Sequence, residues 1–216
     1  MSSGLFITLE GGEGAGKSTQ IQRLAAHLGA RGHQVITTRE PGGSPGAEAI
    51  RSVLLDTGAM ALDATTEALL FAAARRDHVR ATIRPALKAG HIVLCDRFID
   101  STRAYQGAGG DLSRALIRRL ETLAIGRTRP DLTIILDLDP ATGMARAASR
   151  RGAALATSDR FERRGVDFHA AVRAEFLAIA VAEPRRCAVV DAARGPDAVF
   201  ADLVALVDTR LAGRAR

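Results

Sequence analysis

Residues 11–18 read Gly-Gly-Glu-Gly-Ala-Gly-Lys-Ser, and this stretch decides how the chain folds. It follows the apolar run 5–9 and precedes a helical pattern over residues 17–30. Two glycines that flank four residues, followed by Lys-Ser, between a strand and a helix, are typical of a phosphate-binding P-loop. The sequence therefore predicts a nucleoside-triphosphate site at this turn.

The glycines of this loop explain why it suits phosphate. They leave no Cβ in the way, so the backbone N–H groups can converge on one anion. The following helix adds unpaired N–H groups and the positive end of its dipole. We expect Lys17 beside the β and γ phosphates and the Ser18 hydroxyl on Mg²⁺. The predicted triphosphate-binding residues are Gly11, Gly12, Glu13, Gly14, Ala15, Gly16, Lys17, Ser18 and Thr19.

Length and composition fit one α/β domain over residues 1–216, with 47% hydrophobic residues. There is no membrane-length apolar run and no signal-type N-terminus, so we expect a cytoplasmic protein with reduced cysteines and no membrane partner. The net charge of +6 would suit nucleic acid, but aromatics make up only 4% and tryptophan is absent. We expect two polyanionic substrates, and no nucleic acid, to explain part of this charge.

β-rich runs alternate with helical stretches along the chain. This alternation predicts a parallel sheet of five strands with helices on both faces. The expected strands are 5–9, 34–38, 91–95, 132–138 and 187–190. The expected helices lie near 17–30, 45–56, 65–84, 112–126, 140–151, 164–181 and 196–211. Residues 149–162 break the helical pattern with small and charged residues, which indicates a short mobile flap, or lid.

A second group of residues lies at the ends of the predicted strands, where parallel sheets bind ligands. Strand two ends at Arg39 and strand three at Asp96-Arg97, so two arginines can hold a second phosphate. Between them, Phe71 and Arg75 share one helix face and can stack on a base and hydrogen-bond its edge. No Asn-Lys-x-Asp segment of the GTPase type is present.

These segments together resemble the thymidylate kinase family, from about residue 4 to 180 and in the family's order. The matching pieces are 10–19, 39–43, Leu70-Phe71 with Arg75, 96–98, 101–107, 130–132 and 159–162. The resemblance implies the P-loop nucleoside monophosphate kinase fold and transfer of the γ-phosphoryl group of ATP to dTMP, giving dTDP and ADP for dTTP biosynthesis. It also implies Mg²⁺ as cofactor and a homodimer.

The resemblance assigns roles at the phosphates. The P-loop set becomes the ATP site, in which Lys17 and Ser18 serve ATP and Mg²⁺. Arg39 and Arg97 resemble the pair that holds the dTMP phosphate, and Arg97 and Lys17 are the catalytic candidates beside the migrating group. Asp96 resembles the carboxylate near Mg²⁺.

The resemblance also assigns roles around the nucleoside. Glu13 resembles the residue that contacts the sugar 3′-hydroxyl, Phe71 the ring that stacks on thymine, and Arg75 the donor to a thymine carbonyl. Gln106 resembles the side chain that faces the edge of the base, and Tyr105 the one that crowds the 2′ position. The full dTMP set is Glu13, Arg39, Phe71, Arg75, Arg97, Ser101, Tyr105 and Gln106.

Position 14 separates two branches of this family. Some members carry a catalytic arginine there, whereas this chain has Gly14. The bacterial type supplies arginines from the lid instead, so Arg150, Arg151 and Arg160 become catalytic candidates. Residues 153–157 form an insertion between Arg-Gly and Asp-Arg, which leaves open which arginine enters the site.

Other interpretations remain at this stage. A UMP or CMP kinase would use the same P-loop and arginines, and an ATPase switch would need no acceptor. Individual residues also have structural alternatives: Phe71 as core, Tyr105 as a packed ring, the lid arginines as solvated charges, and Arg39–Glu40 as an ion pair within a turn.

Overall fold

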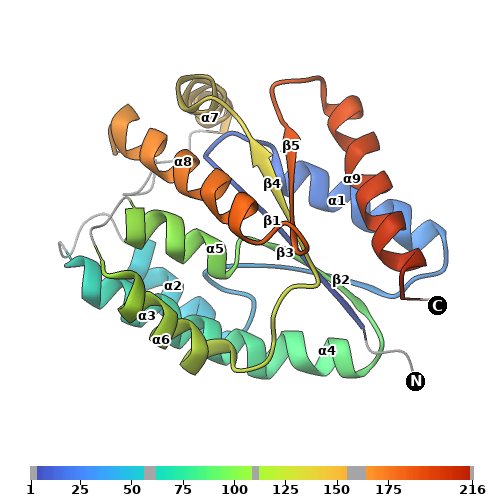
Figure 1. The fold of residues 1–216 in the computed structure, drawn as a ribbon, viewed down its shortest axis with the longest axis horizontal. Coiled ribbons are helices and arrows are strands. Elements are labelled where there is room, and N and C mark those ends of the chain that lie inside the picture. The colour runs from blue at the N-terminus through green and yellow to red at the C-terminus, as the bar shows by residue number, and fades with distance from the viewer. Residues whose placement is uncertain (1–3, 56–61, 109–111, 155–163, 215–216) are drawn as a thin grey trace.

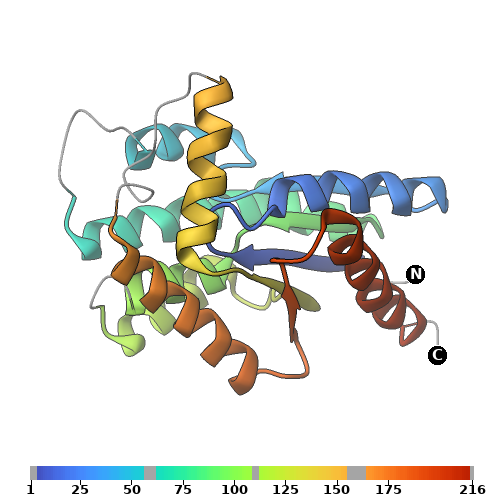
Figure 2. The same cartoon turned by 90° about the horizontal axis from the view of Figure 1, so that it is seen from above.

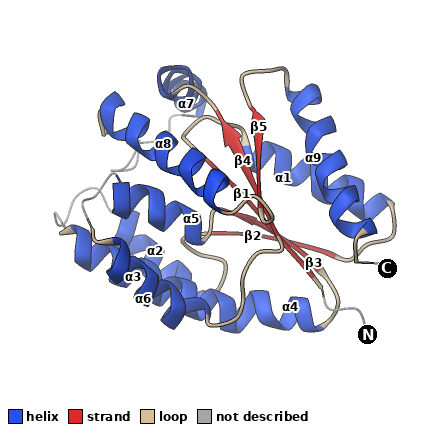
Figure 3. Ribbon diagram, in the orientation of Figure 1, coloured by secondary structure: helices blue, strands red, loops and turns tan. Residues whose placement is uncertain are grey.

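A parallel sheet organises the chain, of which the computed structural model describes residues 4–55, 62–108, 112–154 and 164–214 (Figures 1 and 3). Within these residues the strand order is β2-β3-β1-β4-β5, and each neighbouring pair is parallel. The predicted α/β fold with a five-stranded parallel sheet is confirmed. The strands are β1 (Leu5–Gly11), β2 (Val35–Arg39), β3 (Ile92–Asp96), β4 (Leu132–Asp137) and β5 (Cys187–Asp191).

Helices cover both faces of this sheet, as the pattern predicts (Figure 2). The buried residues Ile21, Leu24 and Leu28 pack α1 against one face of the sheet, beside α9. Apolar residues of α3, α6 and α8 pack on the opposite face. The main helices are α1 (Lys17–Ala30), α2 (Pro45–Leu55), α3 (Ala64–His78), α6 (Arg114–Ile125), α7 (Pro140–Ala154), α8 (Val166–Ala182) and α9 (Pro196–Ala212).

The prediction of a single helix over residues 65–84 is wrong in detail. Helix α3 ends at His78, a π-helical turn spans Val79–Ile83, and α4 (Arg84–Lys88) continues beyond it. Pro85 lies in the first turn of α4, where a missing N–H costs nothing, so the chain passes the proline without stopping.

The segment after β3, for which the sequence pattern predicts no helix, is helical. Helix α5 (Ile99–Thr102) runs into a π-helical segment, Arg103–Ala108. Both are too short for a periodic pattern to reveal them. They matter because they carry several predicted dTMP-binding residues.

Helix α7 crosses the carboxyl ends of the strands and leads to the predicted lid (Figure 2). It extends to Ala154, so residues 149–154 of the predicted flap are helical, and 155–162 lie outside the described residues. None of the helices in the described part of the chain is long and apolar enough to span a membrane.

Candidate active site

The P-loop joins β1 to α1 and leaves the first turn of α1 open to an anion. Gly16 is the N-cap residue of this helix, with φ 88°, so no N-cap side chain occupies the N–H groups of the first turn. Gly14 has φ 69°, and a Cβ there would lie 2.1 Å from the carbonyl oxygen of Gly143 in α7. No side chain, and so no arginine, fits at position 14 without moving the loop.

Lys17 begins α1 and is almost fully buried. Its Nζ donates to the carbonyl oxygens of Gly12 at 2.9 Å and of Gly11 at 3.2 Å. Burial, and then the nearby Arg97, lower the pKa of Lys17 from 10.5 to about 8. A polyphosphate beside this ammonium would favour its charged form, so the site is suited to an anion.

Ser18 and Asp96 form the candidate metal position. The Ser18 hydroxyl donates to Oδ2 of Asp96 at 2.7 Å, from the start of α1 to the end of β3. Hydroxyl and carboxylate oxygens are hard ligands of the type that Mg²⁺ uses with waters and substrate phosphates, so these residues fit that ion. Among the described residues, no group of three or more histidine, cysteine, aspartate or glutamate side chains could hold a metal ion.

Arg97 follows β3 and has φ 68°, a conformation that non-glycine residues rarely adopt. Its Nη1 donates to the Gly11 carbonyl at 3.1 Å and to Ser101 Oγ at 3.2 Å. Ser101 Oγ donates in turn to Glu10 Oε2 at 2.6 Å, and the Phe98 N–H donates to Glu10 Oε1 at 2.7 Å. Glu10 therefore holds both the strained turn and the arginine side chain.

Glu10 is fully buried near the end of β1. Burial, and then the nearby Asp100, raise its pKa from 4.5 to about 7, although bonds from Ser101 and Phe98 act the other way. A carboxyl group in this state at an active site is a candidate for a functional role, and here the role is structural support of Arg97.

The two predicted phosphate-binding arginines line one pocket but have different partners. Arg39, exposed at the end of β2, donates from Nη2 to both carboxylate oxygens of Glu48 at 3.1 and 3.2 Å. Arg97 is more buried and lies 3.8 Å from Glu13 Oε2. The alternative prediction of an Arg39–Glu40 ion pair within the turn is wrong, because Glu40 pairs with Arg75.

The predicted base-binding residues Phe71, Arg75 and Gln106 line the same pocket. Arg75 is buried, and its Nε donates to Glu40 Oε2 at 2.6 Å. Gln106 Nε2 lies 3.5 Å from Glu67 Oε2 on α3, and both side chains are buried.

Tyr105 forms part of the wall of this pocket. The guanidinium carbon of Arg97 lies 5.0 Å from the centre of its ring, a cation–π distance. Phe168 and Phe176 of α8 meet the ring edge-on at 5.9 and 6.4 Å. Burial raises the pKa of the Tyr105 hydroxyl above 10, so this group stays protonated at neutral pH. Tyr105 is thus both a packed ring and a pocket residue.

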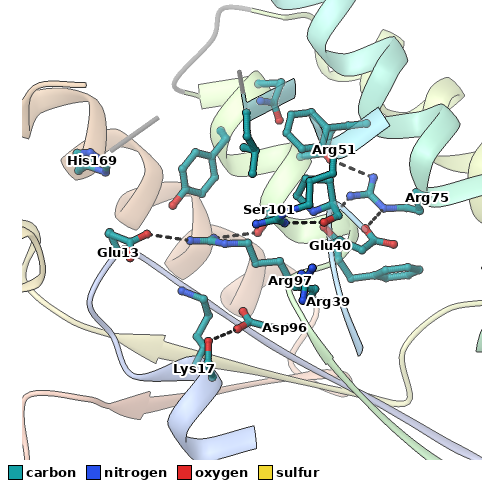
Figure 4. Close-up of a pocket in the computed structure, with 18 residues that line it drawn as sticks. Glu13, Lys17, Arg39, Glu40, Arg51, Arg75, Asp96, Arg97, Ser101 and His169 are labelled. Atoms are coloured by element: carbon teal, nitrogen blue, oxygen red, sulfur yellow. Dashed lines mark hydrogen bonds and ion pairs between the residues drawn. The ribbon is translucent and has the colours of Figure 1, made fainter. Parts of the chain in front are cut away.

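One cavity of about 270 Å³ brings these residues together (Figure 4). Glu13, Lys17 and Asp96 lie at one end, and Glu40 and Arg75 at the other, with Arg97 and Ser101 between them. The predicted residues that line it are Glu13, Lys17, Ser18, Arg39, Phe71, Arg75, Asp96, Arg97, Ser101, Tyr105 and Gln106. The side chains of Arg150, Arg151 and Arg160 lie outside the part of the chain that is described.

Sequence reasoning missed several side chains of this site, among them Glu10, Glu40, Arg51, Thr102 and His169. Glu10 had a signal, because a carboxylate next to an apolar strand is rarely buried without a task. Glu40 and Thr102 neighbour the predicted residues Arg39 and Ser101 in the sequence and line the cavity with them, whereas only the fold brings His169 there. His169 comes from α8, far along the chain from the P-loop.

This geometry defines a class of enzyme. A P-loop with a Ser–carboxylate candidate metal position, sharing one cavity with arginines and an aromatic ring near the strand ends, is the arrangement of a nucleoside monophosphate kinase.

The comparisons with known proteins identify the family. The thymidylate kinase family model matches residues 9–203. The chain is 56% identical over 211 residues to a thymidylate kinase of Caulobacter vibrioides, covering 98% of this chain and 99% of the relative. A thymidylate kinase of Rhodopseudomonas palustris is 55% identical over 214 residues, with 99% and 92% covered.

A solved structure agrees with these relatives. The crystal structure of thymidylate kinase from Ehrlichia chaffeensis matches with a TM-score of 0.75 and 35% identity, over 95% of this chain and 99% of that one. The chain belongs to the thymidylate kinase family, and its reaction is the phosphorylation of dTMP to dTDP by ATP. The alternatives of a UMP or CMP kinase and of an ATPase switch are not supported.

Proposed function

We propose that dTMP lies with its phosphate between Arg39 and Arg97 and its base beside Phe71, so that the acceptor oxygen faces the γ-phosphate of ATP. The observation that carries this proposal is the single cavity lined by Lys17, both arginines and Phe71. Phosphoryl transfer has a loose transition state, so positioning and charge neutralisation provide most of the catalysis. Lys17 and Arg97 are placed to provide both.

Ser18 and Asp96 are the residues that would hold Mg²⁺. The ion supplies charge neutralisation between the phosphates when it is bound. Asp96 has no proton to remove, because the acceptor is already a phosphate anion. Its role is to organise the metal's ligands together with the Ser18 hydroxyl, to which it is already bonded.

The lid supplies the remaining positive charge in our proposal. Gly14 cannot carry an arginine, because its Cβ would meet the Gly143 backbone. Arg150, Arg151 and Arg160 are the candidates, which would place this chain in the bacterial type. Replacing the operative one with alanine should lower kcat by roughly 10³–10⁵, as for arginine fingers. If each single alanine variant keeps kcat within threefold of wild type, the lid assignment is wrong.

Dimerisation is also proposed, and its support is the family resemblance. Helices α3 and α6 pack together and leave Leu69 and Leu123 exposed by 51% and 72%. Light scattering at micromolar protein should give twice the mass of one chain. A single-chain mass at that concentration would refute the homodimer.

The acceptor assignment is tested by kinetics with each substrate varied. Arg97→Ala and Arg39→Ala should raise KM for dTMP, with a larger effect for the more buried Arg97. KM for ATP should change less. Arg31→Ala, a surface residue paired with Asp208, is the matched control and should behave as wild type. Unchanged KM for dTMP in both variants would refute the assignment.

A further inference from the structure

A buried chain of hydrogen bonds supports Arg75 from behind. Both side chains of the Arg75–Glu40 pair are 4% exposed. The second oxygen of Glu40, Oε1, lies 3.0 Å from Nδ1 of His78, which is fully buried and one helical turn beyond Arg75. The Thr38 hydroxyl lies 2.7 Å from the other ring nitrogen, Nε2.

The chemistry of these groups fixes the direction of the bonds. A carboxylate only accepts, so His78 Nδ1 and Arg75 Nε are both donors to Glu40. Each oxygen of Glu40 thus has a donor, and the carboxylate cannot rotate without losing one.

Two further bonds fix the plane of the guanidinium. Nη1 of Arg75 donates to Thr102 Oγ1 at 3.0 Å, and Nη2 donates to the Phe98 carbonyl at 3.0 Å. Together with the bond to Glu40, three of the five N–H groups have acceptors among the described residues. One N–H remains on each terminal nitrogen, on a side chain that lines the cavity.

We propose that Glu40 and His78 are positioning residues that orient Arg75 as a fixed double donor, and thereby select acceptor bases with a carbonyl at ring position 4. Thymine and uracil have an acceptor at that position, whereas cytosine has an amino donor. With cytosine, the Arg75 donors would face an amino donor, and both groups would be buried without an acceptor. Hydrogen-bonding sites discriminate most strongly against ligands that leave buried polar groups unpaired in this way. The inference rests on the proposed role of Arg75 toward the base.

The direct test compares kcat/KM for dTMP, dUMP and dCMP in variants of this network. Glu40→Gln keeps the shape but removes the charge and one acceptor oxygen. We expect its ratio of dTMP to dCMP to fall about tenfold, as for loss of a charge-assisted hydrogen bond. The ratio of dTMP to dUMP should not change, because both bases have the same carbonyl. His78→Gln, a second variant should the first fail to fold, should give a smaller fall in the same ratio.

The matched control is Glu121→Gln. Glu121 is an equally buried carboxylate that accepts two bonds from Arg103, but it does not line the cavity. It should lower the thermal midpoint and leave both substrate ratios unchanged. Equal losses for all three nucleotides in Glu40→Gln and His78→Gln would show a structural role only and overturn the inference.

Arg75→Gln separates the inference from the proposal beneath it. If this variant keeps the wild-type ratio of dTMP to dCMP, the role of Arg75 at the base is wrong. If it lowers the ratio while Glu40→Gln and His78→Gln do not, Arg75 reads the base but its supporting network does not tune that contact.

Discussion

The contact between α7 and the P-loop gives the sharpest prediction. A Cβ added at Gly143 would lie 2.3 Å from the Glu13 carbonyl oxygen, about 1 Å closer than an ordinary contact. Both partners are backbone, so the P-loop or the helix must shift by a distance of this order. A misplacement of about 1 Å in a positioning site costs roughly 100-fold in rate. We expect Gly143→Ala to lower kcat/KM for ATP by about that factor.

The assay is steady-state ADP release with ATP varied at saturating dTMP, together with thermal unfolding. Helix propensity alone favours alanine over glycine by about 1 kcal/mol. A loss of activity or stability in Gly143→Ala is therefore attributable to the contact with the Glu13 carbonyl and not to helix propensity. Gly29→Ala is the control: it lies in α1, and its Cβ would meet nothing within 4 Å. It should keep wild-type kinetics and unfold at a slightly higher temperature. Wild-type kinetics in a folded Gly143→Ala would refute the reasoning.

Three further predictions follow from buried groups in the site. Glu10 has a raised pKa, so its contribution to stability is full below pH 4.5 and is lost as pH rises to about 7. The free energy of unfolding of the wild type, measured relative to that of Glu10→Gln, should therefore fall by about 3 kcal/mol over that range. Denaturant titrations at pH 5 and 8 measure this difference, and parallel pH curves would contradict it. Lys17 has a lowered pKa near 8, so kcat/KM for ATP, which reports the uncomplexed enzyme, should decline above pH 8. A flat pH profile between 7 and 9 would show that Lys17 keeps its proton. Tyr105→Ala opens the pocket wall and should increase kcat/KM for UMP relative to dUMP, and an unchanged ratio would count against its role at the 2′ position.

Much of this architecture follows from local pattern. The P-loop, the strand and helix alternation and the strand-end arginines Arg39 and Arg97 depend on short segments whose physics is self-contained. The parallel sheet then brings the strand ends together, so the sequence predicted that Lys17, Asp96 and Arg97 share one pocket, and they do. The family resemblance added Glu13, Tyr105 and Gln106, whereas Phe71 and Arg75 were already predicted from their spacing on one helix face.

The rest depends on tertiary contacts that leave no periodic signal. The Glu40–Arg75 pair joins the residue after β2 to α3 across 35 residues, and the bond between Thr38 and His78 joins β2 itself to α3. The π-helical turn beyond His78 was missed for the same reason, because π turns arise from packing and do not follow a residue pattern.

The measurement that tests the account most directly is ADP release with Mg-ATP, with and without each of dTMP, dUMP, dCMP, UMP and CMP. The pocket built from Phe71, Arg75 and Tyr105 predicts strong stimulation by dTMP, less by dUMP, and little by the cytosine nucleotides or UMP. ADP release that no nucleotide stimulates, or that UMP or CMP stimulates as well as dTMP, would contradict the assignment of this cavity as the dTMP site.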